Sequence, residues 1–521
     1  MAGVRFSFPP ARLLVKSDKA MPDRPPAERL SFAAGDAASD LRVRALNDAR
    51  VRPSGEMVLY WMQMYRRASD NAALAYAILR ANELGLPCVV YESLRPDYPF
   101  ASDRFHTFVL ESARDVAAGL AARGLRHVFF LPRTRDEAKG VLAKLTARAA
   151  LVVTDDFPSF IVPAQNAALA RHATCPVLVV DDNAIVPLAL FPKDEIGART
   201  LRPKLARVLG DWLLPLEEPV PRIAAPDRLD LPFEPLRLGK AKVQDLVDGC
   251  AIDHSVSAVP ELPGGASEAA SRADAFVRRR LGEYAADRND PSRNGTSGLS
   301  PYLHFGMLSA RSLALRVRGR EAARGPDEST TAFLEQLIVR RGLAFTFARN
   351  NLRHREYDAV PEWARKTLAE HVPDARPADV PASELIDARS PDPLWNAAQL
   401  ELRTRGVIQS YARMLWGKLP LTWMKNPRDV HALLVQMNDR FALDGRDPDG
   451  YANIGWCFGL HDRPWPSRAI FGTVRSMTSR SARSKLDFEG YIDATYARRR
   501  DLGLEAPATY DDARTYEPSD E

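Results

Sequence analysis

The residues between 392 and 465 combine tryptophans with polar side chains in a pattern that could bind a flat ligand. Four of the chain's eight tryptophans lie between Trp395 and Trp456, and Trp465 follows. Such rings pack in a helical core or against a ligand. The polar residues among them favour a ligand, because a core leaves such groups short of partners. These residues are Asn396, Gln399, Arg413, Asn438, Asp444, Arg446 and Asp447.

The segment 294–309, with the sequence NGTSGLSPYLHFGMLS, has the composition of an anion-binding turn. Its glycines allow the backbone to turn close to a ligand. Thr296, Ser297 and Ser300 supply hydroxyls and amides. Pro301 suits the first turn of a helix, and an anion at such a helix start is favourable. An ordinary helix N-cap is the alternative that this segment alone leaves open.

The segment 437–451, MNDRFALDGRDPDGY, is rich in carboxylates and glycines, so a calcium loop has to be considered. An EF-hand loop with its glycine at Gly450 would need oxygen ligands at the positions of Gly445 and Trp456. The pattern fails at both positions, and we expect no metal site.

Basic residues interrupt the aromatic segment 456–488. They are Arg463, Arg468, Arg475, Arg480, Arg483 and Lys485. A solvated face is one interpretation of this run. The other is a set of phosphate contacts beside a stacking platform, because the arginines alternate with tryptophan rings.

Several strings occur here in the order in which they occur in class II DNA photolyases, a branch of the cryptochrome/photolyase superfamily that uses FAD and blue light. They are VRALNDARVRP, VLYWMQMYRRASDNAALAYA, SGLSPYLHFG, LWNAAQLEL, RMLW, LDGRDP followed by GY, and HDRPW followed by R-x-x-FG. The chain resembles this family over about residues 42 to 495.

The resemblance implies an FAD bent into a U, with its adenine near the flavin ring. The residues that would bind it are Tyr284, Thr296, Ser297, Gly298, Leu299, Ser300, Arg413, Asn438, Asp444, Gly445 and Asp447. Asn438 would face flavin N5, a role that suits an amide because it can donate or accept a hydrogen bond. Trp416, Trp395 and Trp423 would form an electron relay from the flavin towards the surface.

The activity that the resemblance implies is light-driven splitting of cyclobutane pyrimidine dimers in DNA by an electron from excited reduced FAD. The residues expected to be catalytic are Trp416, Trp395, Trp423, Asn438 and Gln336. Those expected to contact DNA are Glu335, Gln336, Arg340, Trp456, Arg463 and Arg475, with Trp456 packed against a flipped-out dimer. One alternative is a cryptochrome-like photoreceptor without repair activity. Another is an α/β nucleotide-binding protein with a helical interaction domain.

Four positions depart from the family's pattern. Gln336 stands where a second glutamate is common, and Gly342 stands where a glutamate follows two arginines. Gln409 lies in Ile-Gln-Ser, where the family has Met-His-Gly. Pro420 falls between two relay tryptophans and should kink or break their helix.

The length of 521 residues suits two domains, and 45% apolar with 27% charged residues is typical of globular proteins. No apolar run reaches about 18 residues, which predicts no membrane span. Four scattered cysteines indicate reduced thiols and a cytoplasmic protein. A net charge of +5 permits DNA as a partner. We expect a monomer.

Alternating apolar runs and helix-like segments predict an α/β domain with a doubly wound parallel sheet at residues 42–212. The expected strands are 57–62, 87–92, 127–131, 150–155 and 176–182, and the expected helices are 69–84, 107–123, 135–148 and 163–172. The resemblance implies an antenna chromophore of unknown identity in this domain. A domain without a ligand is the alternative.

The rest of the chain is predicted to comprise a leader, a linker, a helical domain and a tail. Residues 1–41 are expected to be disordered, and the proline-rich residues 213–270 form a long linker. Residues 271–495 are the all-α FAD-binding domain, and 496–521 are a charged tail. The expected helices of this domain include 271–288, 330–350, 394–419 and 427–440.

Overall fold

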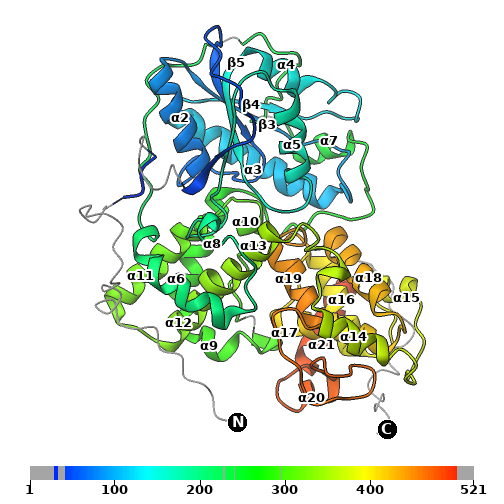
Figure 1. Cartoon of the computed structure of the whole chain (residues 1–521). Helices are drawn as coiled ribbons and strands as arrows, with labels where there is room; N and C mark the ends of the chain where they lie inside the picture. Colours follow the sequence, from blue (N-terminus) through cyan, green and yellow to red (C-terminus); the bar gives the residue numbers. More distant parts are fainter. Residues whose placement is uncertain (1–28, 33–40, 227–228, 240, 294, 502–521) are drawn as a thin grey trace.

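A parallel sheet flanked by helices lies above a helical region in Figure 1. The structure, a computed structural model, describes residues 29–32, 41–226, 229–239, 241–293 and 295–501. The predicted fold class, an N-terminal α/β domain followed by a helical domain, is confirmed.

The sheet has six strands in the order β1-β6-β5-β2-β3-β4. The five predicted strands are parallel: β2 (Met57–Met62), β3 (Cys88–Ser93), β4 (Arg126–Phe130), β5 (Ala149–Asp155) and β6 (Val177–Val180). Their continuous apolar runs reflect burial on both faces. The sequence does not predict the antiparallel edge strand β1 (Val43–Ala45), because three residues are too few to show a period.

Helices cover both faces of the sheet, as a doubly wound fold requires. The helices of this domain are α2 (Ala72–Leu84), α3 (Asp103–Ala122), α4 (Val141–Arg148) and α5 (Val162–His172). Leu74 of α2 joins the core on one face, and Leu145 of α4 joins the core on the other. Helix α2 ends at Gly85, whose φ of 64° suits a glycine C-cap. Its N-cap is Asn71, two residues after the start of the predicted range 69–84.

The helical region contains two groups of helices with separate apolar cores. The first group comprises α6 (Ala198–Trp212), α8 (Ala266–Ala275), α9 (Tyr284–Asp287), α10 (Ser300–His304), α11 (Ala310–Arg324), α12 (Glu328–Leu334) and α13 (Arg341–Asn350). The second comprises α14 (Glu362–Glu370), α15 (Ala382–Ile386), α16 (Pro393–Arg405), α17 (Ser410–Lys418), α18 (Pro427–Phe441), α19 (Pro448–Cys457), α20 (Ser479–Arg483) and α21 (Glu489–Asp501). The core of the first group is continuous with that of the α/β domain.

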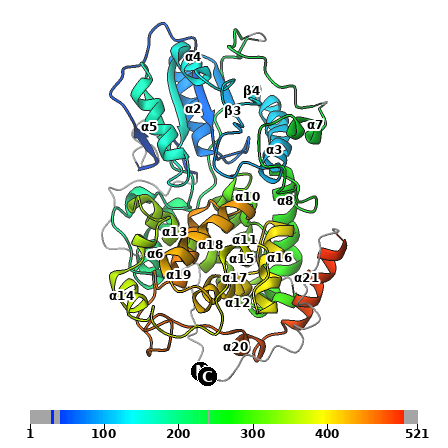
Figure 2. The same ribbon diagram turned by 90° about the vertical axis from the view of Figure 1, so that its right-hand side faces the viewer.

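Helix α6 falls within the segment predicted to be the α/β domain, but it packs in the helical region. It lies beside α11 and α12 in Figure 1 and beside α13 in Figure 2. Its Arg202 pairs with Glu335 at 2.6 Å. The alternation of strands and helices therefore continues into a helix that contacts the helical region.

The predicted leader, linker and tail contain some ordered structure. Leu30 is buried, and its N–H donates to the Pro215 carbonyl at 2.9 Å, so residues 29–32 are packed. The linker includes α7 (Val243–Asp248), and α21 extends into the predicted tail. The remainder of the leader, 1–28 and 33–40, and the tail from 502 lie outside the described residues.

Three of the helices predicted as continuous are interrupted. The helix predicted at 271–288 has a π-helical turn at Phe276–Arg280, and the helix predicted at 330–350 has one at Glu335–Arg340. The helix predicted at 394–419 ends at Gly406, which has φ 66°, and α17 begins at Ser410. π-helical turns are frequent near functional sites.

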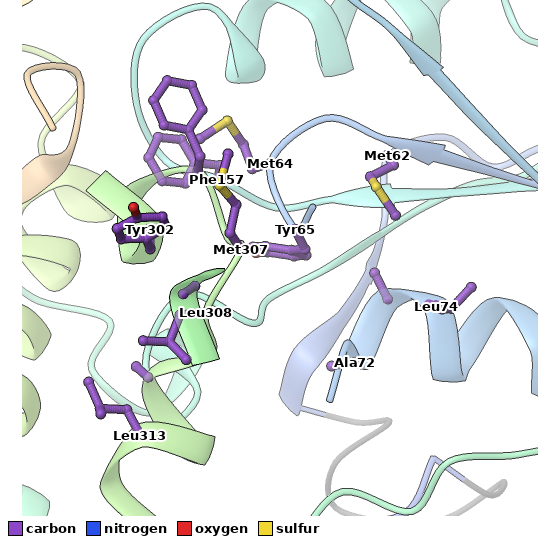
Figure 3. Packing of buried hydrophobic residues seen from close by; sticks show 14 of the residues in the cluster. Met62, Met64, Tyr65, Ala72, Leu74, Phe157, Tyr302, Met307, Leu308 and Leu313 are labelled. Atoms are coloured by element: carbon purple, nitrogen blue, oxygen red, sulfur yellow. The ribbon is translucent and has the colours of Figure 1, made fainter. Parts of the chain in front are cut away.

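The segment after α10 joins the two domains. Figure 3 shows Met307 from this segment and Tyr302 from α10 close to Met64 and Phe157 of the α/β domain. Gly306 has φ 66°, and a Cβ there would collide with the Met64 carbonyl. This junction fills the carboxyl end of β2, where doubly wound sheets usually bind ligands.

Candidate functional site

The predicted cofactor residues lie on both sides of the seam between the two helical groups. Tyr284 and the turn 295–300 belong to the first group, while α17, α18 and α19 belong to the second. Hydrogen bonds cross this seam. His304 Nδ1 lies 3.3 Å from the Asp447 carboxylate, and Gln409 Nε2 donates to the Arg288 carbonyl at 2.8 Å.

The turn before α10 is held from one side and open on the other. Arg280 donates to the carbonyls of Thr296 and Ser297 at 3.3 and 3.4 Å, and Leu299 is fully buried. Gly298 has φ 69°, and no atom lies within 4 Å of the position that a Cβ would take. The backbone at Gly298 and the exposed Ser300 therefore border free space, as an anion cradle requires.

Arg413 of α17 pairs with Asp444, between α18 and α19, at 2.8 Å. Its Nε is buried, and among the described residues it has no hydrogen-bond partner. A buried donor without a partner is costly, so this atom fits contact with a bound polar group.

Asn438 is buried on α18, and its Nδ2 donates to the Gly445 carbonyl. Within the described chain, no group donates to its Oδ1. A Cβ on Gly445 would collide with the Asn438 carbonyl, so the LDGRD loop can fold back on α18 only with glycine at that position. The amide is fixed at one end and available at the other.

Asp447 links three helices. It caps α19 by accepting from the Asp449 N–H at 3.0 Å, and it accepts from Arg341 of α13 at 3.4 Å. Burial opposes its ionisation, but Arg341 and His304 together lower the pKa of Asp447. Its carboxylate is committed to protein groups, so direct contact with a cofactor stays a prediction.

Asp449, Arg341 and His304 are site residues that the sequence reasoning missed. Burial and the adjacent Asp447 raise the pKa of the Asp449 carboxyl, which lies 3.3 Å from Arg341. His304 belongs to the SPYLHFG string, and Asp449 is two residues from Asp447. Proximity to the motifs was the available signal.

Tyr284 lies in an aromatic cluster at the edge of the first group. Its ring packs edge-on against Phe276 and Phe333, with centroids 5.9 and 5.2 Å away, and Arg288 lies over it at 5.5 Å. The cluster leaves Tyr284 8% exposed.

The three tryptophans predicted to form a relay are close together in the second core. Trp395 Nε1 donates to the Trp416 carbonyl at 2.9 Å, and Trp416 Nε1 donates to Gln399 at 2.8 Å. The rings of Trp395 and Trp423 meet edge-on, with centroids 5.6 Å apart. Exposure rises from about zero at the first two rings to 4% at Trp423.

Pro420 breaks the helix as predicted. Helix α17 ends at Lys418, and a 3-10 turn covers Leu419–Thr422. The break places the ring of Trp423 against Trp395, a contact that the seven-residue spacing from Trp416 did not suggest.

A family profile for DNA photolyase matches residues 58–224. The deoxyribodipyrimidine photo-lyase of Methanothermobacter thermautotrophicus is 39% identical over 457 residues, which cover 87% of this chain and 97% of that protein. The chain belongs to the DNA photolyase family. The deoxyribodipyrimidine photo-lyase of Oryza sativa is 34% identical over 483 residues, covering 88% and 90%.

The fold also matches a solved photolyase. The archaeal photolyase of Sulfolobus tokodaii, described with two FAD molecules, has a TM-score of 0.59 and 16% identity, covering 86% of this chain and 91% of that one. The predicted membership of the photolyase family, and with it the enzyme class, is confirmed at the level of the family.

The residues that this photolyase would use at DNA lie on two elements. Glu335 and Gln336 lie in the second π-helical turn with the exposed Arg340. Arg202 holds both Glu335 oxygens, at 2.6 and 3.0 Å. Gln336 is half-buried, and its amide has no partner among the residues described. Gln336 is therefore available for a ligand, whereas Glu335 is occupied.

The second element is the basic segment after α19. Arg475 lies over two tryptophan rings, 5.7 Å from the centroid of Trp456 and 4.9 Å from that of Trp465. Arg463 lies 5.0 Å over Trp465. Both arginines are exposed and Trp456 is half-buried, so this face combines positive charge with accessible rings.

Two further departures from the photolyase pattern have local explanations. The Gln409 side chain caps α17 by accepting from the N–H groups of Tyr411 and Ala412 at 2.7 and 3.0 Å. Gly342 faces Leu205 of α6, which lies 3.6 Å from the position of a Cβ. A glutamate there would enter an apolar contact.

A membrane-spanning helix and a metal site would each leave a recognisable pattern in the described residues. No helix in the described ranges has the length and hydropathy needed to cross a bilayer. The same residues contain no group of three or more His, Cys, Asp or Glu suited to a metal ion.

Proposed function

We propose that the protein is a class II photolyase that binds FAD and repairs cyclobutane pyrimidine dimers in DNA under blue light. The observation that carries the proposal is the seam, where two hydrogen bonds join the helical group that carries an open turn to the group that carries an unpartnered arginine donor, a half-satisfied amide and three tryptophans in contact. The relatives named photo-lyase over most of this chain support the same activity.

The residues at the seam fit FAD. Thr296 to Ser300 would hold its diphosphate, and Tyr284, Asp444, Gly445 and Asp447 would line its rings and ribose. Arg413 would place positive charge beside the flavin, and Asn438 would offer its free end to N5. Bound FAD would supply light-driven one-electron chemistry at this seam.

The remaining residues act on the substrate. Gln336 donates a hydrogen bond to the dimer, Trp456 stacks on it, and Arg340, Arg463 and Arg475 bind phosphates. Trp416, Trp395 and Trp423 supply electrons that keep the site reduced. The protein acts as a cytoplasmic monomer, and an antenna chromophore in the α/β domain stays part of the proposal.

Two measurements test this function. The supernatant of the denatured protein, separated by chromatography, should contain FAD, and FMN alone or no flavin would contradict the proposal. An oligonucleotide that carries a thymine dimer should regain its pyrimidine absorbance under blue light with the reduced protein.

A cryptochrome-like photoreceptor is the second candidate. Glu335 is held by Arg202, and an amide replaces the second carboxyl at Gln336, so neither residue of this π-helical turn offers a free carboxylate to the lesion. A protein that contains FAD and photoreduces normally, but repairs no dimers, would support this candidate.

A further inference from the structure

The site tryptophans fall into two electrostatic classes. The first comprises Trp416, Trp395 and Trp423, whose indoles contact one another or neutral acceptors. Trp416 donates to the Gln399 oxygen, and Trp395 donates to a backbone carbonyl. Across the described ranges, no lysine or arginine lies over any of these three rings.

The second class comprises Trp456 and Trp465, whose rings face cations. Lys418 Nζ lies 5.2 Å from the Trp456 centroid, and the Arg475 guanidinium lies 5.7 Å from it. Trp465 has Arg475 and Arg463 over its ring, at 4.9 and 5.0 Å. Five side chains thus alternate between cation and ring from the core to the surface.

Lys418 is the unusual member, because its ammonium is fully buried. Nζ donates to the Cys457 carbonyl at 2.6 Å, and no carboxylate among the described residues forms an ion pair with it. Burial lowers the pKa of Lys418 to about 8, so the group still carries its charge at neutral pH. A buried charge without a counter-ion destabilises a fold, and an apolar residue of similar shape would avoid that penalty.

The charge has a direct effect on the adjacent ring. Removing an electron from Trp456 would place a positive charge on its ring, 5.2 Å from the Lys418 ammonium. The repulsion is strong there, because the buried ammonium is poorly screened by solvent. Removing an electron from Trp416 instead places the positive charge on a ring whose Nε1–H already faces the Gln399 oxygen.

We propose that Lys418 and Arg475 protect Trp456 from oxidation and so confine electron donation to Trp416, Trp395 and Trp423. This inference rests on the proposed function. Each step moves one electron, from Trp395 to oxidised Trp416 and then from Trp423 to oxidised Trp395. The positive charge left on Trp423 is removed by one electron from an external thiol. Trp456 stays intact as the platform for the dimer.

The test uses Trp416→Phe as its background. Photoreduction of bound flavin should fall by about a hundredfold in Trp416→Phe and recover about tenfold when Lys418→Met and Arg475→Met are added. Adding Trp456→Phe should remove that recovery. Arg428→Met, which removes a cation over Tyr357 at 5.2 Å, is the matched control and should give no recovery.

Peptide mass spectrometry after illumination gives a second readout that is independent of activity. Without an external thiol, oxidised tryptophan should accumulate at Trp423 in the wild type. In Lys418→Met/Arg475→Met it should also appear at Trp456. Arg475→Met alone, a change at an exposed residue, should shift oxidation in the same direction and covers the case in which loss of Lys418 prevents folding.

The outcomes separate the two proposals. Unchanged photoreduction in Trp416→Phe would remove the relay and with it the proposed function. Photoreduction could instead be blocked in Trp416→Phe and stay blocked when Lys418→Met and Arg475→Met are added, with normal flavin content and no oxidised Trp456. That result would leave the relay intact and overturn the protective role of Lys418 and Arg475.

Discussion

The interior of the candidate site and its outer face use the same residue type in opposite settings. Trp416 and Trp395 are buried among neutral hydrogen-bond acceptors, whereas Trp456 lies half-buried between two cations. The first setting suits a ring that loses an electron, and the second suits a ring that stacks on an anionic ligand. Environment rather than residue identity therefore assigns the role, and variants in the two regions should fail in different assays.

The largest expected effect is in the interior. Trp416→Phe should slow flavin photoreduction by about a hundredfold, or roughly 2.7 kcal/mol of activation free energy, with flavin content unchanged. Because the Trp423 ring contacts Trp395, Trp423→Phe should also slow it clearly. Steady-state absorbance under blue light with a thiol present measures both. A Trp423→Phe protein with normal rates would place the end of the relay elsewhere.

The outer face should respond in DNA binding and not in photoreduction. Trp456→Ala should reduce the preference for ultraviolet-damaged over intact duplex by about 1–3 kcal/mol, because a stacking ring is lost. Arg463→Gln should weaken binding to both duplexes and reduce the salt dependence. Competition binding at several salt concentrations separates the two. Full preference in Trp456→Ala would show that this ring only packs in the protein.

The sequence predicted the helices and strands of the molecule better than the contacts between their side chains. Continuous apolar runs predicted five strands because parallel strands are buried on both faces. Pro420 predicted the break after α17, but the resulting contact of Trp423 with Trp395 depends on tertiary packing. Single charged residues in helical segments, such as Lys418 and Arg341, resemble solvent-exposed positions in sequence, so only the structure shows that they are buried.

A smaller effect is expected on stability at Lys418. Its folded pKa of about 8 lies below the unfolded value, so the unfolded chain binds more protons between these values and stability rises with pH there. Lys418→Met should therefore be more stable than wild type at pH 7, by about 1–2 kcal/mol after the lost hydrogen bond, with the advantage shrinking towards pH 10. Asp462, Arg475 and the Cys457 thiol, whose pKa burial raises to about 11, are the other charged or titratable groups beside it.

Urea unfolding at pH 7 and at pH 9.5 measures this difference. A variant that is less stable than wild type at both values would show that the bond from Lys418 to the Cys457 carbonyl outweighs the burial of its charge.

The smallest effect concerns Gln336, in the π-helical turn Glu335–Arg340. Its amide has no partner among the described residues, while Arg202 holds the neighbouring Glu335. A carboxylic acid at 336 could donate a short O–H···O hydrogen bond to the dimer radical anion, whereas the amide N–H donates a longer and weaker one. Gln336→Glu should leave flavin content unchanged and raise the repair quantum yield by roughly fivefold, or about 1 kcal/mol.

Glu335→Gln is the matched control for Gln336→Glu, because it changes a carboxyl that already has an arginine partner. It should lower stability slightly and leave the repair yield close to that of wild type, since the Glu335 oxygens face Arg202. The two substitutions lie on adjacent residues of one π-helical turn, so a yield that responds only at 336 assigns the lesion contact to that side chain. If neither wild type nor Gln336→Glu repairs dimers while both photoreduce FAD, the photolyase proposal fails and the photoreceptor takes its place.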